Sequence, residues 1–273
     1  RRYSSAASDV YKRQAVTFMA VRDIAYAYRL RLMTNNRISW GRAIRMILLW
    51  EFGSAATPSS VGGTTLAVLL LSKEGFSPGR SAGTVMLSIF FDEIFFITTI
   101  PIFLLIFGTA AIIPDLTHSN AADIRGVELS GLSTMFYISY AVIFGYTVLL
   151  TYGLLISPFR IKQLLFWVTS LRWLRRFRKG AVKAGNDIMV TSQQIRGKPF
   201  SFFVKGYLAT LVSWAGRFLV ANLIILAIGG QLDHLLVFSR QVVMFVCMSV
   251  SPTPGGSGVA ELSFSTFLAE FIP

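Results

Sequence analysis

The sequence predicts an all-α membrane protein, a polytopic helical bundle that contains two re-entrant hairpins in an inverted arrangement. Of its 273 residues, 53% are hydrophobic and only 14% are charged, whereas a soluble domain carries roughly 25% charged residues. The mean hydropathy is +0.60. Lysine and arginine give a formal charge of +13 and gather in loops between apolar runs, as the positive-inside rule describes for membrane proteins. Two of the apolar segments are interrupted by the same kind of Pro/Gly motif.

The N-terminal residues are set apart from the predicted fold. Asp9–Gln14 resembles a translated sequencing-library adapter, and the chain does not open on Met. We therefore expect residues 1–14 to be non-native and residues 15–273 to form a single transmembrane domain, truncated at both ends. Ala15–Met33 begins apolar and turns basic, which is typical of the end of a truncated spanning helix.

Three apolar segments predict membrane-spanning helices: Gly83–Gly108, Gly131–Ile156 and Phe200–Ile228. Each is longer than the roughly 20 residues that a helix needs to cross the hydrocarbon core. The loop Thr109–Ser130 is net acidic, whereas Ser157–Lys198 is strongly basic. The positive-inside rule therefore places the basic loop in the cytoplasm and the acidic loop outside.

The basic stretch 158–199 has a pattern of its own. Apolar residues recur at helical spacing from Ile161 to Leu174, and basic residues crowd the end of this run. The pattern predicts an amphipathic helix at the membrane surface, where each basic residue contributes about 1 kcal/mol of attraction to anionic lipid. The alternative is a solvated basic loop that only fixes the orientation. The sequence has no motif that indicates a nucleic-acid partner.

The first broken segment, Met46–Leu71, is interrupted by the sequence TPSSVGG at Thr57–Gly63. Proline and glycine disfavour a continuous helix at this point. The flanks Asn35–Arg45 and Lys73–Arg80 are both basic, so the charge rule places both in the cytoplasm. The segment therefore predicts a re-entrant hairpin of two half-helices. The alternative is one straight span that contradicts the charge rule.

The second broken segment, Leu235–Ile272, is interrupted at Ser251–Glu261 by the sequence SPTPGGSGVAE. The spans place the preceding loop, Gly229–His234, on the outer side, so this segment enters from the opposite face. Two hairpins of inverted topology would meet near the midplane. Such paired breaks in corresponding halves of a chain indicate a transporter's substrate site. The alternative is two proline kinks in ordinary spanning helices.

Six ionisable residues lie within the apolar segments: Glu51, Asp92, Glu93, Arg217, Arg240 and Glu261. A charge at the membrane centre costs roughly 2.5–3.5 kcal/mol, so each invites a functional interpretation. Counted from the cytoplasmic ends of their helices, Asp92 and Arg217 lie at depths that would allow them to pair. One hypothesis is therefore a buried ion pair that fixes helix packing. The other leaves Arg217 to bind a lipid phosphate through its planar fork. The position of Glu261 predicts an acid in the first turn of the second half-helix. A cation ligand or a proton carrier is an equally possible role for it.

The two motifs, Thr57–Gly63 early and Pro252–Glu261 late, together resemble those of the lysylphosphatidylglycerol synthase transmembrane region family, also called flippase-like or UPF0104. The resemblance covers nearly the whole chain after residue 14. The late Pro-Gly-Gly…Gly-Val-x-Glu string is its most specific part, and Asp92 matches an acid that members carry. Many members have an acid where this chain has Thr64, and Glu-Arg where it has Ser88-Ile89, so roles of those charges do not carry over.

The resemblance implies a multi-pass protein of the inner (plasma) membrane that translocates or presents an anionic, aminoacylated or polyprenyl-linked lipid. A membrane-embedded transferase acting on a lipid-linked sugar or amino acid is the alternative, and a scaffold for envelope synthesis is a third. The expected partner is a phospholipid or polyprenyl-phosphate lipid; no cofactor, metal or catalytic residue is expected. The candidate substrate-binding residues are Thr57, Pro58, Gly62, Gly63, Asp92, Arg217, Pro254, Gly255, Gly256, Gly258 and Glu261.

Overall fold

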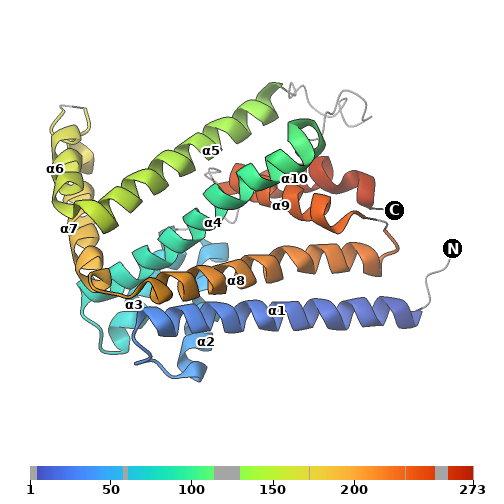
Figure 1. Ribbon diagram of the computed structural model, residues 1–273, viewed down its shortest axis with the longest axis horizontal. Helices are drawn as coiled ribbons and strands as arrows, with labels where there is room; N and C mark the ends of the chain where they lie inside the picture. The colour runs from blue at the N-terminus through green and yellow to red at the C-terminus, as the bar shows by residue number, and fades with distance from the viewer. Residues whose placement is uncertain are drawn as a thin grey trace.

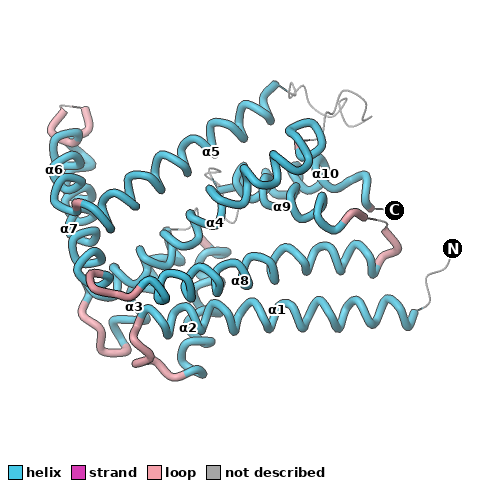
Figure 2. The backbone as a smooth tube through the Cα atoms, viewed as in Figure 1, coloured by secondary structure: helices cyan, strands magenta, loops and turns pink. Residues whose placement is uncertain are grey.

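A computed structural model describes residues 5–57, 61–113, 130–171, 173–230, 232–249 and 258–272. The described part is helical and contains no strand (Figures 1 and 2). Its α-helices are α1 (Ser5–Met33), α2 (Trp40–Ala56), α3 (Val61–Lys73), α4 (Pro78–Ile112), α5 (Ser130–Thr151), α6 (Pro158–Val168), α7 (Arg178–Ile195), α8 (Phe200–Ala227), α9 (His234–Ser249) and α10 (Val259–Leu268).

Three of the described helices are long and apolar enough to cross a membrane: α4, α8, and α5 together with the π-helical turn Tyr152–Ile156 that continues it. These are the three spans that the sequence predicts. Within α4 the backbone departs from helical geometry at Gly108, where φ is 73°. Glycine tolerates this left-handed conformation, and the regular helix therefore breaks where the predicted span ends.

Helices α1 and α8 lie side by side along much of their length (Figure 1). Gly216 of α8 permits their close approach, because a Cβ at this position would lie 3.0 Å from the Phe18 carbonyl oxygen and 3.1 Å from Cβ of Arg22. α1 is 29 residues long and includes residues 5–14 in the same helix. Ala15–Met33, expected to be the end of a truncated spanning helix, is part of α1 and packs against α8. Whether the chain is truncated stays a prediction.

Helices α2 and α3 form a hairpin, because they pack against each other and their outer ends meet. Arg42 Nη1, near the start of α2, donates a hydrogen bond of 2.7 Å to Glu74 Oε2, directly after α3. Toward the turn, a Cβ at Gly53 would lie 3.3 Å from the Cα of Gly63. The chain thus returns to the end from which it entered, as the sequence predicts. That this hairpin is re-entrant in a membrane stays a prediction.

Helices α9 and α10 form the second hairpin. Arg240 Nη1 of α9 donates a hydrogen bond of 2.9 Å to the carbonyl oxygen of Phe267, near the end of α10. Gly230, which precedes α9, abuts the carbonyl oxygen of Phe271 so closely that a side chain would collide with it. In Figure 1, α9 and α10 lie to the right and α2 and α3 to the left. Residues 58–60, between α2 and α3, and residues 250–257, between α9 and α10, lie outside the described residues.

Helices α6 and α7 pack against each other at the left end of Figure 1. The predicted amphipathic helix continues to Leu174, and this extent is wrong because α6 ends at Val168. The Thr169 hydroxyl donates a hydrogen bond of 2.7 Å to the Leu165 carbonyl oxygen. The Ser170 hydroxyl donates one of 2.8 Å to the Phe166 carbonyl oxygen, and these bonds satisfy the end of the helix.

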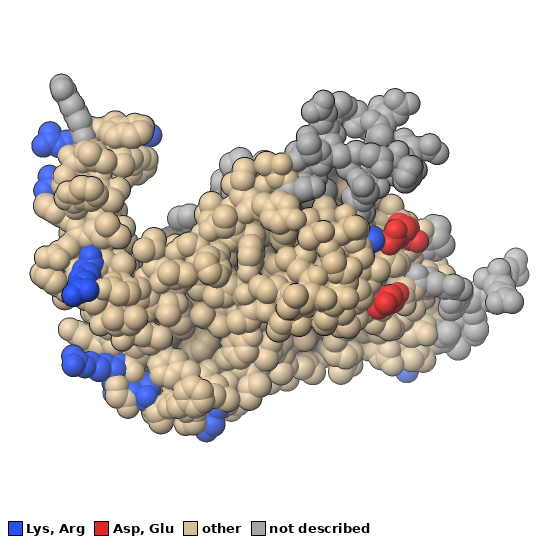
Figure 3. Space-filling view, turned by 45° about the horizontal axis from the view of Figure 1, so that its top comes forward, with Lys and Arg blue, Asp and Glu red and all other residues tan. Residues whose placement is uncertain are grey.

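The face of the molecule in Figure 3 shows most of its lysines and arginines at the end where α6 and α7 lie, hereafter the basic end. The acidic residues visible on this face lie at the other end.

An aromatic cluster joins α4, α8 and α9. The rings of Phe96, Trp214 and Phe245 lie with centroids 4.7 to 5.2 Å apart, and Phe218 stacks on Trp214 at 5.5 Å. Aromatic pairs at these separations gain about 0.5–1.5 kcal/mol beyond their burial. The cluster therefore fixes the three helices firmly, and it does so directly beside the charged groups described below.

The first prediction concerns the hairpin of α2 and α3. Cysteines at Gly41, where a Cβ meets nothing within 4 Å, and at exposed Ser77 should react from the same side of the membrane. The background is Cys247→Ala, which removes the native thiol. His234→Cys, at the start of α9, should react from the opposite side. The measurement is labelling by an impermeant thiol reagent in intact cells and in inverted vesicles. Labelling of Gly41→Cys and Ser77→Cys from opposite sides would show that the segment crosses the membrane.

Candidate functional site

Charged side chains from four helices meet in the interior of the bundle. We call this set the charge cluster; it comprises Arg22 and Arg29 of α1, Glu51 of α2, Asp92 of α4 and Arg217 of α8. Arg29 is 3% exposed and Arg22 is 8% exposed. Buried charges of this kind persist only when other groups compensate them. Their hydrogen-bond partners therefore decide what each residue can do.

Arg29 and Asp92 form a closed ion pair. Arg29 donates from Nη1 to Asp92 Oδ1 at 2.6 Å and from Nη2 to Oδ2 at 3.0 Å, which is the two-pronged geometry of a strong pair. The same nitrogens donate to the hydroxyls of Thr210 at 2.8 Å and Ser88 at 2.7 Å. Asp92 Oδ1 also accepts a hydrogen bond of 2.9 Å from the indole Nε1 of Trp214. This pair holds α1, α4 and α8 together.

Glu51 bridges two arginines from different helices. Its Oε2 accepts a hydrogen bond of 2.5 Å from Arg22 Nη2, and its Oε1 accepts one of 2.5 Å from Arg217 Nη2. Arg22 is also bonded to Asp23 Oδ1, at 2.9 Å from Nε and 2.8 Å from Nη2. Through Glu51, hairpin helix α2 is attached to both α1 and α8.

Arg217 differs from Arg29 in having hydrogen-bonding capacity to spare. Its Nε is buried and has no hydrogen-bond partner among the described residues. Its side chain is 32% exposed, against 3% for that of Arg29. The guanidinium carbon lies 5.2 Å from the centre of the Trp214 ring, a cation–π contact. A buried donor without an acceptor costs about 1–3 kcal/mol, so Arg217 favours the arrival of one more acceptor.

The chain matches the family described as "Lysylphosphatidylglycerol synthase TM region" over residues 14–273. It belongs to this family. A UPF0104 membrane protein of Archaeoglobus fulgidus is 28% identical over 258 residues, which covers 92% of this chain and 73% of the relative. No solved structure matches the chain. The family resemblance that the two Pro/Gly motifs indicate is thereby confirmed, and the protein is a multi-pass membrane protein of this family.

Within this family member, a direct Asp92–Arg217 pair is not formed, and that hypothesis is wrong. Asp92 pairs with Arg29, and Arg217 pairs with Glu51. The reason is α1, which brings two further arginines into the interior. Sequence reasoning missed both, although their seven-residue spacing places Arg22 and Arg29 on one face of a helix. Ser88 accepts a hydrogen bond from Arg29.

The other ionisable residues of the apolar segments have separate surroundings. Arg240 donates from Nε to the Ala111 carbonyl oxygen at 2.9 Å and pairs with Glu270 at 2.7 Å, so it fastens the ends of helices. Glu93 has a buried Oε2 without a partner among the described residues. Glu261 Oε2 accepts a hydrogen bond of 2.5 Å from the Gly258 amide. Glu261 is therefore the first-turn acid on α10 that the sequence predicts.

The predicted residues of the first turn serve the contact between α2 and α3. The Thr57 hydroxyl donates 2.7 Å to the Gly53 carbonyl oxygen. A Cβ at Gly62 would collide with the Thr57 side chain, and one at Gly63 with Ser54. Glycine is therefore needed there for packing. Four further candidates, Pro58, Pro254, Gly255 and Gly256, lie outside the described residues, so their part in a site stays a prediction.

The second prediction separates the two ion pairs of the charge cluster. Asp92→Asn should destabilise the protein by about 3–5 kcal/mol, because it leaves Arg29 buried without a counter-ion. The double variant Asp92→Asn/Arg29→Gln should recover much of that loss. Asp92→Asn combined with Arg217→Gln should be close to additive. Two double-mutant cycles of the free energy of unfolding measure both couplings. Stronger coupling of Asp92 to Arg217 than to Arg29 would contradict the observed pairing.

Proposed function

We propose that this protein is a flippase-like carrier that translocates or presents an anionic, aminoacylated or polyprenyl-linked lipid across the inner membrane. The observation that carries the proposal is Arg217 on α8, a helix long and apolar enough to cross the membrane. Its guanidinium is partly buried, and its Nε has no acceptor in the part of the chain that the structure describes. A guanidinium offers a planar fork of donors that fits phosphate oxygens in two places. A phosphate ester is a common group that an anionic phospholipid and a polyprenyl-phosphate lipid would both present.

Glu51 acts in this proposal as the resident anion that the lipid phosphate replaces. Its carboxylate accepts one hydrogen bond from Arg22 and one from Arg217, two arginines that a phosphate could also bridge. The Glu51 side chain is 28% exposed, so it can turn toward water when it leaves the arginines. Asp92 is not available for exchange in this way, because Arg29 holds both of its oxygens.

The exchange would also release a mechanical link. Glu51 lies on α2, and its two ion pairs attach the first hairpin to α1 and α8. Loss of both pairs on lipid binding would free this hairpin to move relative to the bundle. The second hairpin lies toward the opposite end of the molecule (Figure 1). We place the basic end in the cytoplasm because of the positive-inside rule.

A membrane-embedded transferase is the second candidate function. Its support is the family's description, which names the transmembrane region of a synthase. The two candidates differ in what they leave behind, since a carrier changes the leaflet of an unaltered lipid and a transferase changes its mass. Mass spectrometry of the lipids after each transport assay therefore distinguishes them.

The third prediction tests the carrier in proteoliposomes that contain fluorescent phosphatidylglycerol, with the fluorophore in the outer leaflet quenched by dithionite. Arg217→Gln should slow lipid movement about 10- to 100-fold, because a hydrogen bond to a charged group contributes about 1.5–3 kcal/mol. Glu51→Gln should bind phosphatidylglycerol more tightly, because the competing carboxylate is gone.

The matched control is Arg42→Gln, which removes one arginine from a surface ion pair with Glu74 and should leave the rate unchanged. Fluorescent phosphatidylcholine tests whether the headgroup charge matters. Wild-type rates in a folded Arg217→Gln protein would exclude Arg217 as the lipid ligand.

A further inference from the structure

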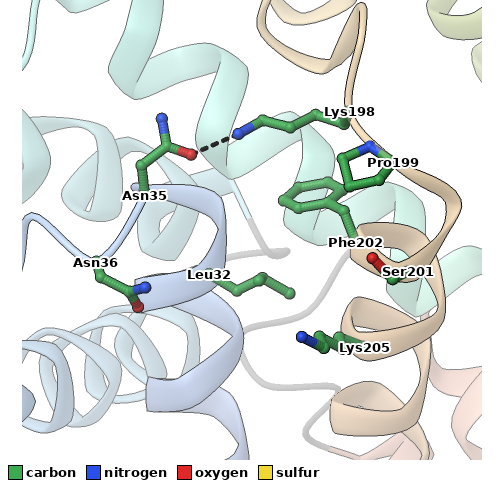
Figure 4. Close-up of a pocket in the computed structure, with 8 residues that line it drawn as sticks. All are labelled: Leu32, Asn35, Asn36, Lys198, Pro199, Ser201, Phe202 and Lys205. Carbon is green, nitrogen blue, oxygen red and sulfur yellow. Dashed lines mark hydrogen bonds between the residues drawn. The ribbon is translucent and has the colours of Figure 1, made fainter.

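A cavity of about 310 Å³ opens at the basic end, between the C-terminal end of α1 and the N-terminal end of α8 (Figure 4). It adjoins a second cavity of about 350 Å³, which shares Asn35, Lys198 and Phe202 with it and extends to Arg80 of α4. None of the residues that line either cavity belongs to the charge cluster. The pair of cavities is therefore a separate feature of the molecule.

The lining of these cavities is cationic and carries no compensating acid. Lys198, Lys205 and Arg80 are its charged residues, with no aspartate or glutamate among the described residues that line it. Lys198 Nζ donates 2.6 Å to Asn35 Oδ1, which is a neutral acceptor (Figure 4). Lys205 is exposed and has no hydrogen bond or ion pair with the described part of the chain. The arginines of the charge cluster, by contrast, each have a carboxylate partner. The cavity is thus prepared for an anion from outside the chain.

The first turn of α8 adds further positive character to this lining. α8 begins at Phe200, directly after Pro199, and Ser201 of its first turn lines the cavity. The first amides of a helix lack intrahelical acceptors, and the helix dipole places partial positive charge there. Such a helix start beside two lysines suits the oxygens of a phosphate group.

The outer face of α8 indicates what kind of molecule carries this phosphate group. Phe200, Val204, Leu208 and Val212 recur every four residues and are 82%, 38%, 52% and 44% exposed. On a helix that crosses the membrane, this apolar stripe faces lipid chains, and Lys205 lies at its end nearest the cavity. We propose that the cavity binds the phosphate-bearing headgroup of an anionic phospholipid, whose acyl chains lie along this stripe.

The experiment is native mass spectrometry of the purified chain in detergent, titrated with dioleoyl phosphatidylglycerol or with dioleoyl phosphatidylcholine. Lys205→Gln should weaken phosphatidylglycerol binding about fivefold, and Lys198→Gln/Lys205→Gln about 25-fold, since each lysine near anionic lipid contributes about 1 kcal/mol. Phosphatidylcholine binding should change little. Ser201→Trp, which fills the cavity without altering charge, should weaken phosphatidylglycerol binding as well. Because Lys205 has no hydrogen bond or ion pair with the described residues, Lys205→Gln should unfold at the wild-type temperature.

The matched control is Lys73→Gln/Lys179→Gln, which removes two exposed lysines from the same end of the molecule but outside both cavities. It should keep wild-type affinity for phosphatidylglycerol. An equal loss in the control and in Lys198→Gln/Lys205→Gln would overturn the proposal in favour of general surface charge. Displacement of phosphatidylglycerol by millimolar inorganic phosphate would overturn it in favour of a soluble ligand. Both readouts concern binding alone, so they stand whether or not the protein moves lipid.

Discussion

The ion pair between Arg29 and Asp92 is the interaction on which the interior of this bundle depends. A guanidinium that is 3% exposed in a membrane protein would be prohibitively unstable without compensation. Here the carboxylate accepts one hydrogen bond from each terminal nitrogen of Arg29, and the hydroxyls of Thr210 and Ser88 accept one more each. Because these groups come from three helices, the pair forms only when α1, α4 and α8 are correctly placed. Removing α1 or α4 would leave one buried charge uncompensated, and removing α8 would take away the hydrogen bonds of Thr210 and Trp214.

The arginines of the interior differ in how fully their donors are used, and this difference separates structure from function. Arg29 and Arg240 are bonded to carboxylates together with hydroxyl or carbonyl oxygens supplied by other helices, so they fix packing. Arg217 keeps an Nε without a partner among the described residues and a partly exposed side chain beside Glu51, the carboxylate that we propose a lipid phosphate replaces. A binding site needs such unused capacity, because a saturated cation would have to lose a partner before it gained a ligand.

Much of the architecture follows from the sequence because its determinants are local. Three spans could be predicted from apolar length alone, and the helix pairs α2–α3 and α9–α10 from the Pro/Gly motifs that interrupt their segments. Their re-entrant placement in a membrane stays a prediction. The breaks also marked residues that matter for packing, since Gly63 lies against Ser54 and Gly53 of the facing helix. The first-turn role of Glu261 was likewise predictable from its spacing to Gly258, because capping involves neighbours in the chain.

The pairing within the charge cluster could not be predicted in this way, because it depends on which helices become neighbours. Counting residues from the cytoplasmic surface puts Asp92 and Arg217 about 9 Å apart in depth, which left a direct pair as one hypothesis. In the structure each has another partner. This count of depths did not include α1. Its arginines were interpreted as the basic end of a truncated helix and not as residues that face the interior. The end of α6 was missed for a similar reason, since the hydroxyls of Thr169 and Ser170 satisfy its last turn without any glycine or proline signal.

The two proposed anion-binding sites, at Lys205 and at Arg217, lie on one helix but not on one face of it. Lys205 and Arg217 are separated by 12 residues of α8, which is about 18 Å along the axis and about 120° around it. A lipid headgroup seated at the basic end therefore cannot contact Arg217 by sliding along a single face. It must pass around α8, and the side toward α1 is closed where Gly216 meets Arg22. In the function that we propose, capture of a headgroup and its transfer to the interior are therefore separate steps, and the second requires helices to move.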